Sequence, residues 1–268
     1  MPDSAPGFRP AGTAAASGCG PVTFLLLGAS NLARSWRALA GCLRANLSPD
    51  SVEFLAACGP GRGYVAPGGL LNITYPPIQT CGIFDAAQKA SVWGHRVVAL
   101  LTDIGNDLLY DVRGEELVRG VDSVIGRLRQ LNARVLITPV HPALEQKLTP
   151  RRFIFLRTWL YPKSRTPYAQ VIDGLRQVNR FLVARQETGE VSLIRGMEAY
   201  QGWDQVHYGF FRARGAWTLA AENMLQALAT SLHRPVTLAG LMAAYLDYAR
   251  HLVITDMLSL ASGGRGVY

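Results

Sequence analysis

The sequence predicts an α/β protein built on a three-layer, doubly wound sheet of about five parallel strands. Two observations support this: short, continuous apolar runs that suit strands buried on both faces, and helical patterns of apolar residues that alternate with those runs. The 268 residues suit one such domain. With 49% hydrophobic and 17% charged residues, the composition excludes a disordered, coiled-coil or collagenous chain.

The elements follow one another in a regular order. A first strand is expected at 22–28 (VTFLLLG), a helix at 32–47 and a second strand at 52–59, so the chain opens with a βαβ unit. The remaining candidates are strands at 96–105, 133–140 and 191–196, with helical patterns at 113–131 and 168–187. Parallel strands with right-handed crossovers hold ligands outside their carboxyl ends, so the loops after the strands are the places to search for function.

The domain organisation expected from composition has three parts. Residues 1–20 are rich in Ala, Gly, Pro and Ser and predict a flexible N-terminal segment. The α/β domain is expected at 21–234. Residues 235–268 predict a C-terminal extension of one or two helices and a loose tail.

Charge and cysteine content indicate the expected surroundings. The net charge is +8, but the basic residues are scattered, which favours an ordinary basic surface and no nucleic-acid partner. The four cysteines form no CxxC pair and indicate reduced thiols. No apolar run approaches the roughly 18 residues of a membrane span, and the run at 22–27 is too short for a signal peptide. We therefore expect a cytoplasmic protein without a transmembrane segment.

Polar residues follow the first and third strands. Ser30 stands in GASN at the turn into a helix, whose unpaired amides favour negative charge. This suits a nucleophile, but the motif alone favours a helix cap, because Ser and Asn are the commonest caps. Asn106 stands in TDIGND, where its amide could donate to a developing oxyanion, or simply make a turn.

A third polar pair follows the fifth strand. Asp204 and His207, in WDQVHYG, are three residues apart, close enough in a turn for the carboxylate to orient the imidazole. Each motif alone is weak evidence. Together they fall on one edge of the predicted sheet, which favours a catalytic site over coincidence.

These blocks resemble those of the SGNH, or GDSL-type, hydrolases over about residues 22–225. The resemblance maps the nucleophile onto Ser30, with Ala29 where the family has an acidic residue, and places Asn106 in the oxyanion hole. Asp204 and His207 match the DxxH block. The resemblance also implies a backbone donor in CGPGRGY (58–64), for which Gly63 is preferred and Gly61 is next. It implies the flavodoxin-like form of the sheet.

The function expected is a serine hydrolase that cleaves an acyl or acetyl ester. His207 takes the proton of Ser30, Asp204 stabilises the imidazolium, and the oxyanion rests on the amides of Ser30 and Gly63 and the side chain of Asn106. No metal or cofactor is expected, and the substrate is a small-molecule ester. The oligomeric state and the acyl group are left open.

Three other functions compete with this one. An alcohol acceptor in place of water would make the same site an acyltransferase. A non-catalytic member of the fold could bind a carbohydrate or a protein. A nucleotide or phosphate binder is weaker, because the glycines follow the second strand in a GxGxG spacing rather than the first in GxGxxG.

The segment 141–168 is long for a connection after a strand and predicts a functional loop. It interleaves aromatic and basic residues, and we expect it to form a lid or wall over Ser30 that contacts substrate. The predicted substrate-binding residues are Arg151, Arg152, Arg157 and Trp159. The alternative is that FIFLRTWL packs on the domain as an ordinary helix.

Overall fold

The structure is a computed structural model that describes residues 20–69, 73–140, 144, 148–162 and 164–253. The predicted flexible N-terminal segment, apart from Gly20, and the tail at 254–268 lie outside the described residues. So do residues 141–143, 145–147 and 163 of the predicted loop at 141–168.

The centre of the molecule is a parallel five-stranded sheet, as predicted, in the order β2-β1-β3-β4-β5. The strands are β1 (Val22–Leu27), β2 (Val52–Ala57), β3 (Arg96–Leu101), β4 (Arg134–Ile137) and β5 (Ser192–Leu193). The chain runs outward in one direction from β1 to β2 and in the other from β3 onward. The carboxyl ends of β1 and β3 therefore flank the point where ligands bind in doubly wound sheets.

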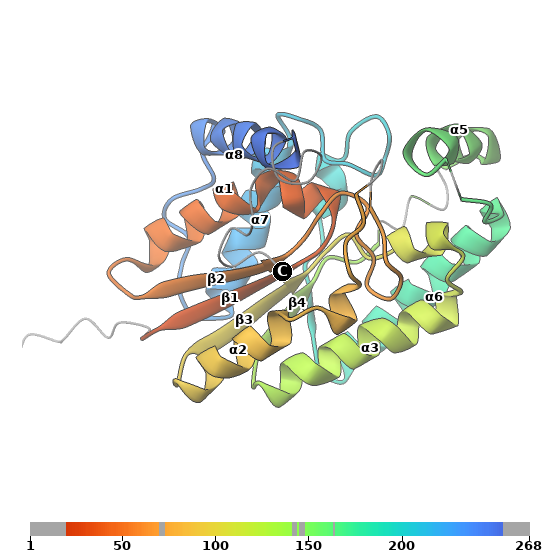
Figure 1. Cartoon of the computed structure of the whole chain (residues 1–268). Coiled ribbons are helices and arrows are strands. Elements are labelled where there is room, and N and C mark those ends of the chain that lie inside the picture. The colour runs from red at the N-terminus through yellow and green to blue at the C-terminus, as the bar shows by residue number, and fades with distance from the viewer. Residues whose placement is uncertain (1–19, 70–72, 141–143, 145–147, 163, 254–268) are drawn as a thin grey trace, which may run out of the picture.

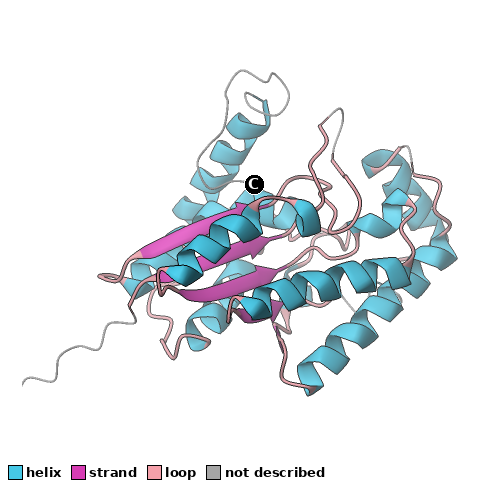
Figure 2. Ribbon diagram, turned by 60° about the horizontal axis from the view of Figure 1, so that its bottom comes forward, coloured by secondary structure: helices cyan, strands magenta, loops and turns pink. Residues whose placement is uncertain are grey.

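Helices cover both faces of the sheet and give the three predicted layers (Figures 1 and 2). One face carries α1 (Ser30–Leu47), α7 (Ala213–Gln226) and α8 (Leu238–His251). The other carries α2 (Ile83–Val92), α3 (Gly114–Gln130), α5 (Pro150–Leu160) and α6 (Tyr168–Glu187). Three short 3-10 helices complete the elements: η1 (Ile78–Thr80), η2 (Asn106–Tyr110) and η3 (Met197–Tyr200).

The apolar run of β1 explains its central place. Successive side chains of a strand point to opposite faces, so every residue of a central strand must be apolar or satisfied. Leu25 and Leu27 pack into the core under α2, α3 and α6, whereas Phe24 and Leu26 pack into the core under α1 and α7. All four are fully buried.

The elements differ from expectation in three ways. Each strand ends one to four residues before the predicted position, because the last apolar residues of each pattern already belong to the turns of the carboxyl edge. Helices α2 and α7 were not predicted. Residues 150–160 of the predicted loop form α5, with Phe153 and Leu156 buried, which is the packing that the alternative interpretation expected.

The predicted C-terminal extension contains α8, which packs along α1. Arg37 of α1 and Asp247 of α8 form an ion pair at 2.7 Å. No helix of the described part of the chain is both long enough and apolar enough to cross a bilayer.

Candidate active site

Three side chains from opposite ends of the sequence form a hydrogen-bonded relay. Ser30 is the first residue of α1, and its Oγ lies 3.0 Å from Nε2 of His207. The other ring nitrogen of His207, Nδ1, lies 2.6 Å from Oδ2 of Asp204. The predicted spacing of three residues thus brings carboxylate and imidazole into direct contact, and the fold brings both to Ser30.

The turn between Asp204 and His207 is built by the carboxylate itself. Asp204 Oδ1 accepts hydrogen bonds from the backbone N–H groups of Val206 and His207, while Gln205 adopts a positive φ of 60°. The Asp204 side chain is 9% exposed, and burial alone would raise its pKa. The hydrogen bonds from His207 and Val206 outweigh burial and lower the pKa of Asp204 below its ordinary value, which favours the ionised form.

The amino end of α1 is held by a carboxylate from the neighbouring strand. Asp103 follows β3, and its Oδ2 accepts from the backbone N–H groups of Ala29, Asn31 and Leu32 at 2.9, 3.1 and 3.3 Å. Its Oδ1 accepts from the Asn31 side chain at 2.8 Å. The carboxylate satisfies amides that a helix start leaves unpaired, although Ala29 itself offers no cap.

The backbone N–H of Ser30 differs from those of its neighbours in its hydrogen bonding. None of the described residues accepts a hydrogen bond from it, whereas the residues on both sides donate to Asp103. Within the described part of the chain, this N–H therefore remains available at the amino end of α1, where the helix dipole favours negative charge.

Asn106 begins η2 after β3, next to Gly105, whose φ of 136° suits only glycine. Both ends of the Asn106 amide are engaged. Its Oδ1 accepts from the hydroxyl of Tyr161 at 2.9 Å, and its Nδ2 donates to the carbonyl of Arg62 at 3.3 Å. Tyr161 therefore fixes which way the amide points. Its own ring packs edge-on against Tyr110, and burial raises its pKa, which keeps its hydroxyl protonated as a donor.

The glycine loop after β2 passes beside Asn106. Asp107 holds the loop in shape, because its carboxylate accepts from the backbone N–H groups of Tyr64, Val65 and Ala66, each at 2.8 Å. Burial raises the pKa of Asp107 against these three hydrogen bonds. Packing around Gly63 is tight: an added Cβ would lie 2.5 Å from Asp107 Oδ1.

The direction of the peptide before Gly63 bears on its predicted role. In a trans peptide the C=O and N–H point opposite ways, and the Arg62 carbonyl faces Asn106 Nδ2. The Gly63 N–H consequently points away from that amide. The role of Gly63 as donor stays a prediction.

The predicted substrate residues of α5 occupy different positions. Arg157 lines the cavity beside Ser30; its guanidinium lies over the ring of Phe153 and donates to the carbonyl of Thr166 at 2.9 Å. Arg151 and Trp159 are exposed, Trp159 by 61%, and neither they nor Arg152 line the cavity. Contact of these four residues with substrate stays a prediction.

Two contributors to the site escaped sequence reasoning. The sequence offers a signal for Asp103, which is a carboxylate two residues after a buried strand and in the same TDIGND segment as Asn106. Tyr161 belongs to the aromatic and basic segment 141–168, but nothing in the sequence indicates that it contacts Asn106. Across the described ranges, no group of three or more His, Cys, Asp or Glu side chains could hold a metal ion.

No protein-family model and no curated protein matches the sequence. Solved structures similar to this one include a member of the lipolytic G-D-S-L family from Veillonella parvula (13% identity, 75% of this chain and 97% of that chain, TM-score 0.43). Others are a psychrotrophic esterase from a Pseudoalteromonas species (12%, 77% and 98%, 0.42) and a family 3 carbohydrate esterase from Clostridium thermocellum (12%, 78% and 98%, 0.46). At these identities the likeness concerns the fold alone.

Proposed function

We propose that this protein is an SGNH-type serine hydrolase that cleaves an ester bond. The observation that supports this most is the unbroken relay from Ser30 Oγ through His207 to Asp204, with distances of 3.0 and 2.6 Å. A helix-capping role for Ser30 does not explain its contact with an imidazole. A surface role for His207 does not explain its contact with a buried carboxylate.

The reaction proceeds through an acyl-enzyme. Ser30 Oγ attacks the ester carbonyl carbon while His207 Nε2 takes the hydroxyl proton. The tetrahedral intermediate collapses, the bond to the leaving oxygen breaks, and His207 returns the proton to that oxygen, which departs as the alcohol. Water then attacks the acyl carbonyl carbon while His207 takes its proton. The bond from that carbon to Ser30 Oγ breaks, His207 returns the proton to Ser30 Oγ, and the acid is released.

The backbone N–H of Ser30 and the side-chain amide of Asn106 stabilise the oxyanion. The Ser30 N–H has no acceptor among the described residues, and the Asn106 amide is held by Tyr161 with its Nδ2 toward the glycine loop. A glycine N–H of 59–63 supplies the further donor. Each donor of this kind contributes about 3 kcal/mol to the transition state.

The decisive experiment uses a fluorophosphonate probe and p-nitrophenyl acetate. The wild-type protein should be labelled at Ser30 and hydrolyse the ester. Ser30→Ala should lose labelling and about 10⁶-fold in turnover, because members of a triad act as a unit. Ser35→Ala, on the same helix, is the matched control and should retain both activities.

A second pair of variants separates the base from other imidazoles. His207→Ala should abolish turnover, whereas His233→Ala, in the loop before α8, should not. Normal hydrolysis by Ser30→Ala, with its melting temperature unchanged, contradicts the proposed mechanism outright.

A further inference from the structure

A hydrophobic cavity of about 160 Å³ lies directly beside the relay. Ser30 and Asn106 are among the residues that line it. Its apolar walls come from four parts of the described fold: the turn after β3 with η2, the segment between β4 and α5, helix α5 itself, and the first two turns of α6. The side chains that form them include Ile104, Leu109, Phe153, Leu156, Val171 and Leu175.

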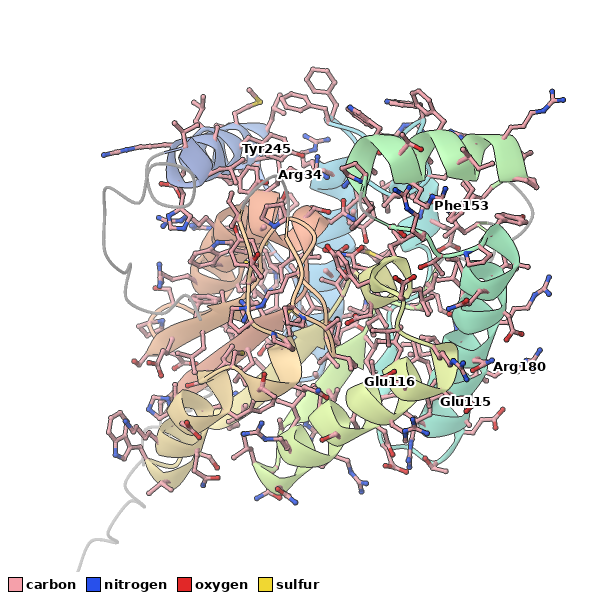
Figure 3. The ribbon with its side chains drawn as sticks, turned by 45° about the vertical axis from the view of Figure 1, so that its right-hand side comes forward. Arg34, Glu115, Glu116, Phe153, Arg180 and Tyr245 are labelled. Atoms are coloured by element: carbon pink, nitrogen blue, oxygen red, sulfur yellow. The ribbon has the colours of Figure 1, made fainter. Side chains whose placement is uncertain are left out.

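Helix α5 supplies a wall that the sheet alone would lack. Phe153 and Leu156 are buried on the side of α5 that faces the molecule, and Figure 3 shows Phe153 beneath the helix. Phe153 packs edge-on against Tyr168 of α6, whose hydroxyl donates to the carbonyl of Leu148 at 2.7 Å. These contacts hold α5 against α6 and so fix the position of the cavity wall that the two helices form.

The geometry of the relay decides which half of an ester enters the cavity. His207 must reach the leaving oxygen to return a proton to it, so the leaving group lies on the His207 side of Ser30. His207 is not among the described residues that line the cavity, although its neighbours Val206 and Tyr208 are. The apolar side chains of α5 and α6 that form its wall lie on the opposite face of the sheet from α7, the helix that follows His207. With the carbonyl oxygen toward Asn106, the substituent that points into the cavity is the acyl chain.

Resting on the proposed function, we infer that this cavity binds the acyl group and selects aliphatic acyl esters of medium length. An apolar protein cavity of about 150 Å³ holds one benzene molecule, or six carbon atoms. The cavity here therefore suits an acyl chain of about six carbon atoms. An acetyl group leaves most of its apolar wall uncovered, and a chain of twelve or more carbon atoms exceeds its volume.

The chain-length profile of p-nitrophenyl esters measures this selectivity. Burial of each methylene is worth about fourfold in kcat/KM, from about 0.8 kcal/mol per methylene. From acetyl to hexanoyl, four methylenes give an upper limit of roughly 250-fold. We expect kcat/KM to rise along this series, to pass through a maximum near six carbons and to fall for decanoyl and longer esters.

Two cavity variants should move the maximum in opposite directions, which a general loss of stability cannot do. Leu156→Phe fills the cavity and should shift the preference toward shorter esters. Phe153→Leu enlarges it and should shift the preference toward longer esters. Ile154→Phe places the same aromatic ring on the same helix at a side chain that is 52% exposed, and it should leave the profile unchanged.

A charged chain end is the competing specificity, because Arg157 also lines the cavity. A monoester of adipic acid has six acyl carbons and a terminal carboxylate. A preference for this monoester over the hexanoyl ester would overturn the inference of an apolar acyl site. A lower kcat/KM for the monoester supports it.

A binding measurement separates this inference from the proposed function. Calorimetry on Ser30→Ala needs no turnover, and it should show binding of hexanoate with a negative heat-capacity change and much weaker binding of acetate. A flat profile with Ser30-dependent hydrolysis of acetyl esters, and no binding of hexanoate, refutes the acyl site and leaves the hydrolase. Binding of hexanoate without hydrolysis of any ester refutes the hydrolase instead.

Discussion

Removal of one hydroxyl, in Tyr161→Phe, should lower kcat without a matching change in KM. The hydroxyl donates to Asn106 Oδ1 at 2.9 Å and is the contact that sets the direction of the amide. A hydrogen bond of this kind contributes about 0.5–1.5 kcal/mol. If Asn106 stabilises the transition state, that energy appears in kcat, as a decrease of roughly 2- to 13-fold.

The assay is the steady-state hydrolysis of p-nitrophenyl acetate. Its acetyl group is short, so its hydrolysis should be insensitive to changes in the apolar wall of the cavity. Tyr168→Phe is the matched control, because it removes a partly buried tyrosine hydroxyl that donates to a carbonyl, that of Leu148, near the same helix. Both variants should lose stability by a similar amount, which thermal unfolding would show. Only Tyr161→Phe should lose kcat.

A double-mutant cycle tests the cause. Once Asn106 is alanine, the hydroxyl of Tyr161 has no amide to orient, so adding Tyr161→Phe should cost nothing further in kcat. Coupled residues behave in this non-additive way, whereas independent ones add. Equal losses from Tyr161→Phe in the wild-type and Asn106→Ala backgrounds would refute the reasoning.

Three further predictions concern the rest of the site. Asn106→Ala should lower kcat by roughly 10²–10³ with little change in KM, and a pure KM effect in steady-state kinetics would instead make Asn106 a substrate contact. Asp103→Asn should lower the free energy of unfolding in urea by about 1–3 kcal/mol, because one amide cannot accept the hydrogen bonds that both carboxylate oxygens receive; an unchanged urea midpoint would contradict this. Folding lowers the pKa of Asp204, so its ionised carboxylate stabilises the protein at pH values above the ordinary pKa of 3.8. This stabilisation is lost as the pH falls through the lowered pKa. In urea unfolding, the wild type and Asp204→Asn should therefore differ most near neutrality and converge in strong acid.

The sheet could be predicted from the sequence because its strands are buried on both faces. The run at 22–27 has no polar residue besides Thr23, and only a central parallel strand buries such a run. The helices α2 and α7 escaped prediction for a related reason. Both are rich in alanine, and alanine at inward positions gives a weak contrast between the two faces of a helix.

The relay was predictable because its parts are local motifs. Asp204 and His207 meet within one turn, and the topology of a parallel sheet carries Ser30 to the same edge. The contacts of Tyr161 and Asp103 were not predictable in this way. Each joins segments that only the finished tertiary packing brings together, 55 residues apart for Tyr161 and Asn106.

The separation of Ser30 from His207 also has a consequence for synthesis. The two residues are 177 positions apart, although their side chains touch. At about 5–20 residues per second, the ribosome adds His207 roughly 10–35 seconds after Ser30. Under the proposed mechanism, the nascent chain carries Ser30 without its base throughout that interval, and a chain cut short before residue 207 should not hydrolyse esters. Under the proposed mechanism, hydrolysis therefore begins only after residue 207 has been added and its segment has folded against Ser30.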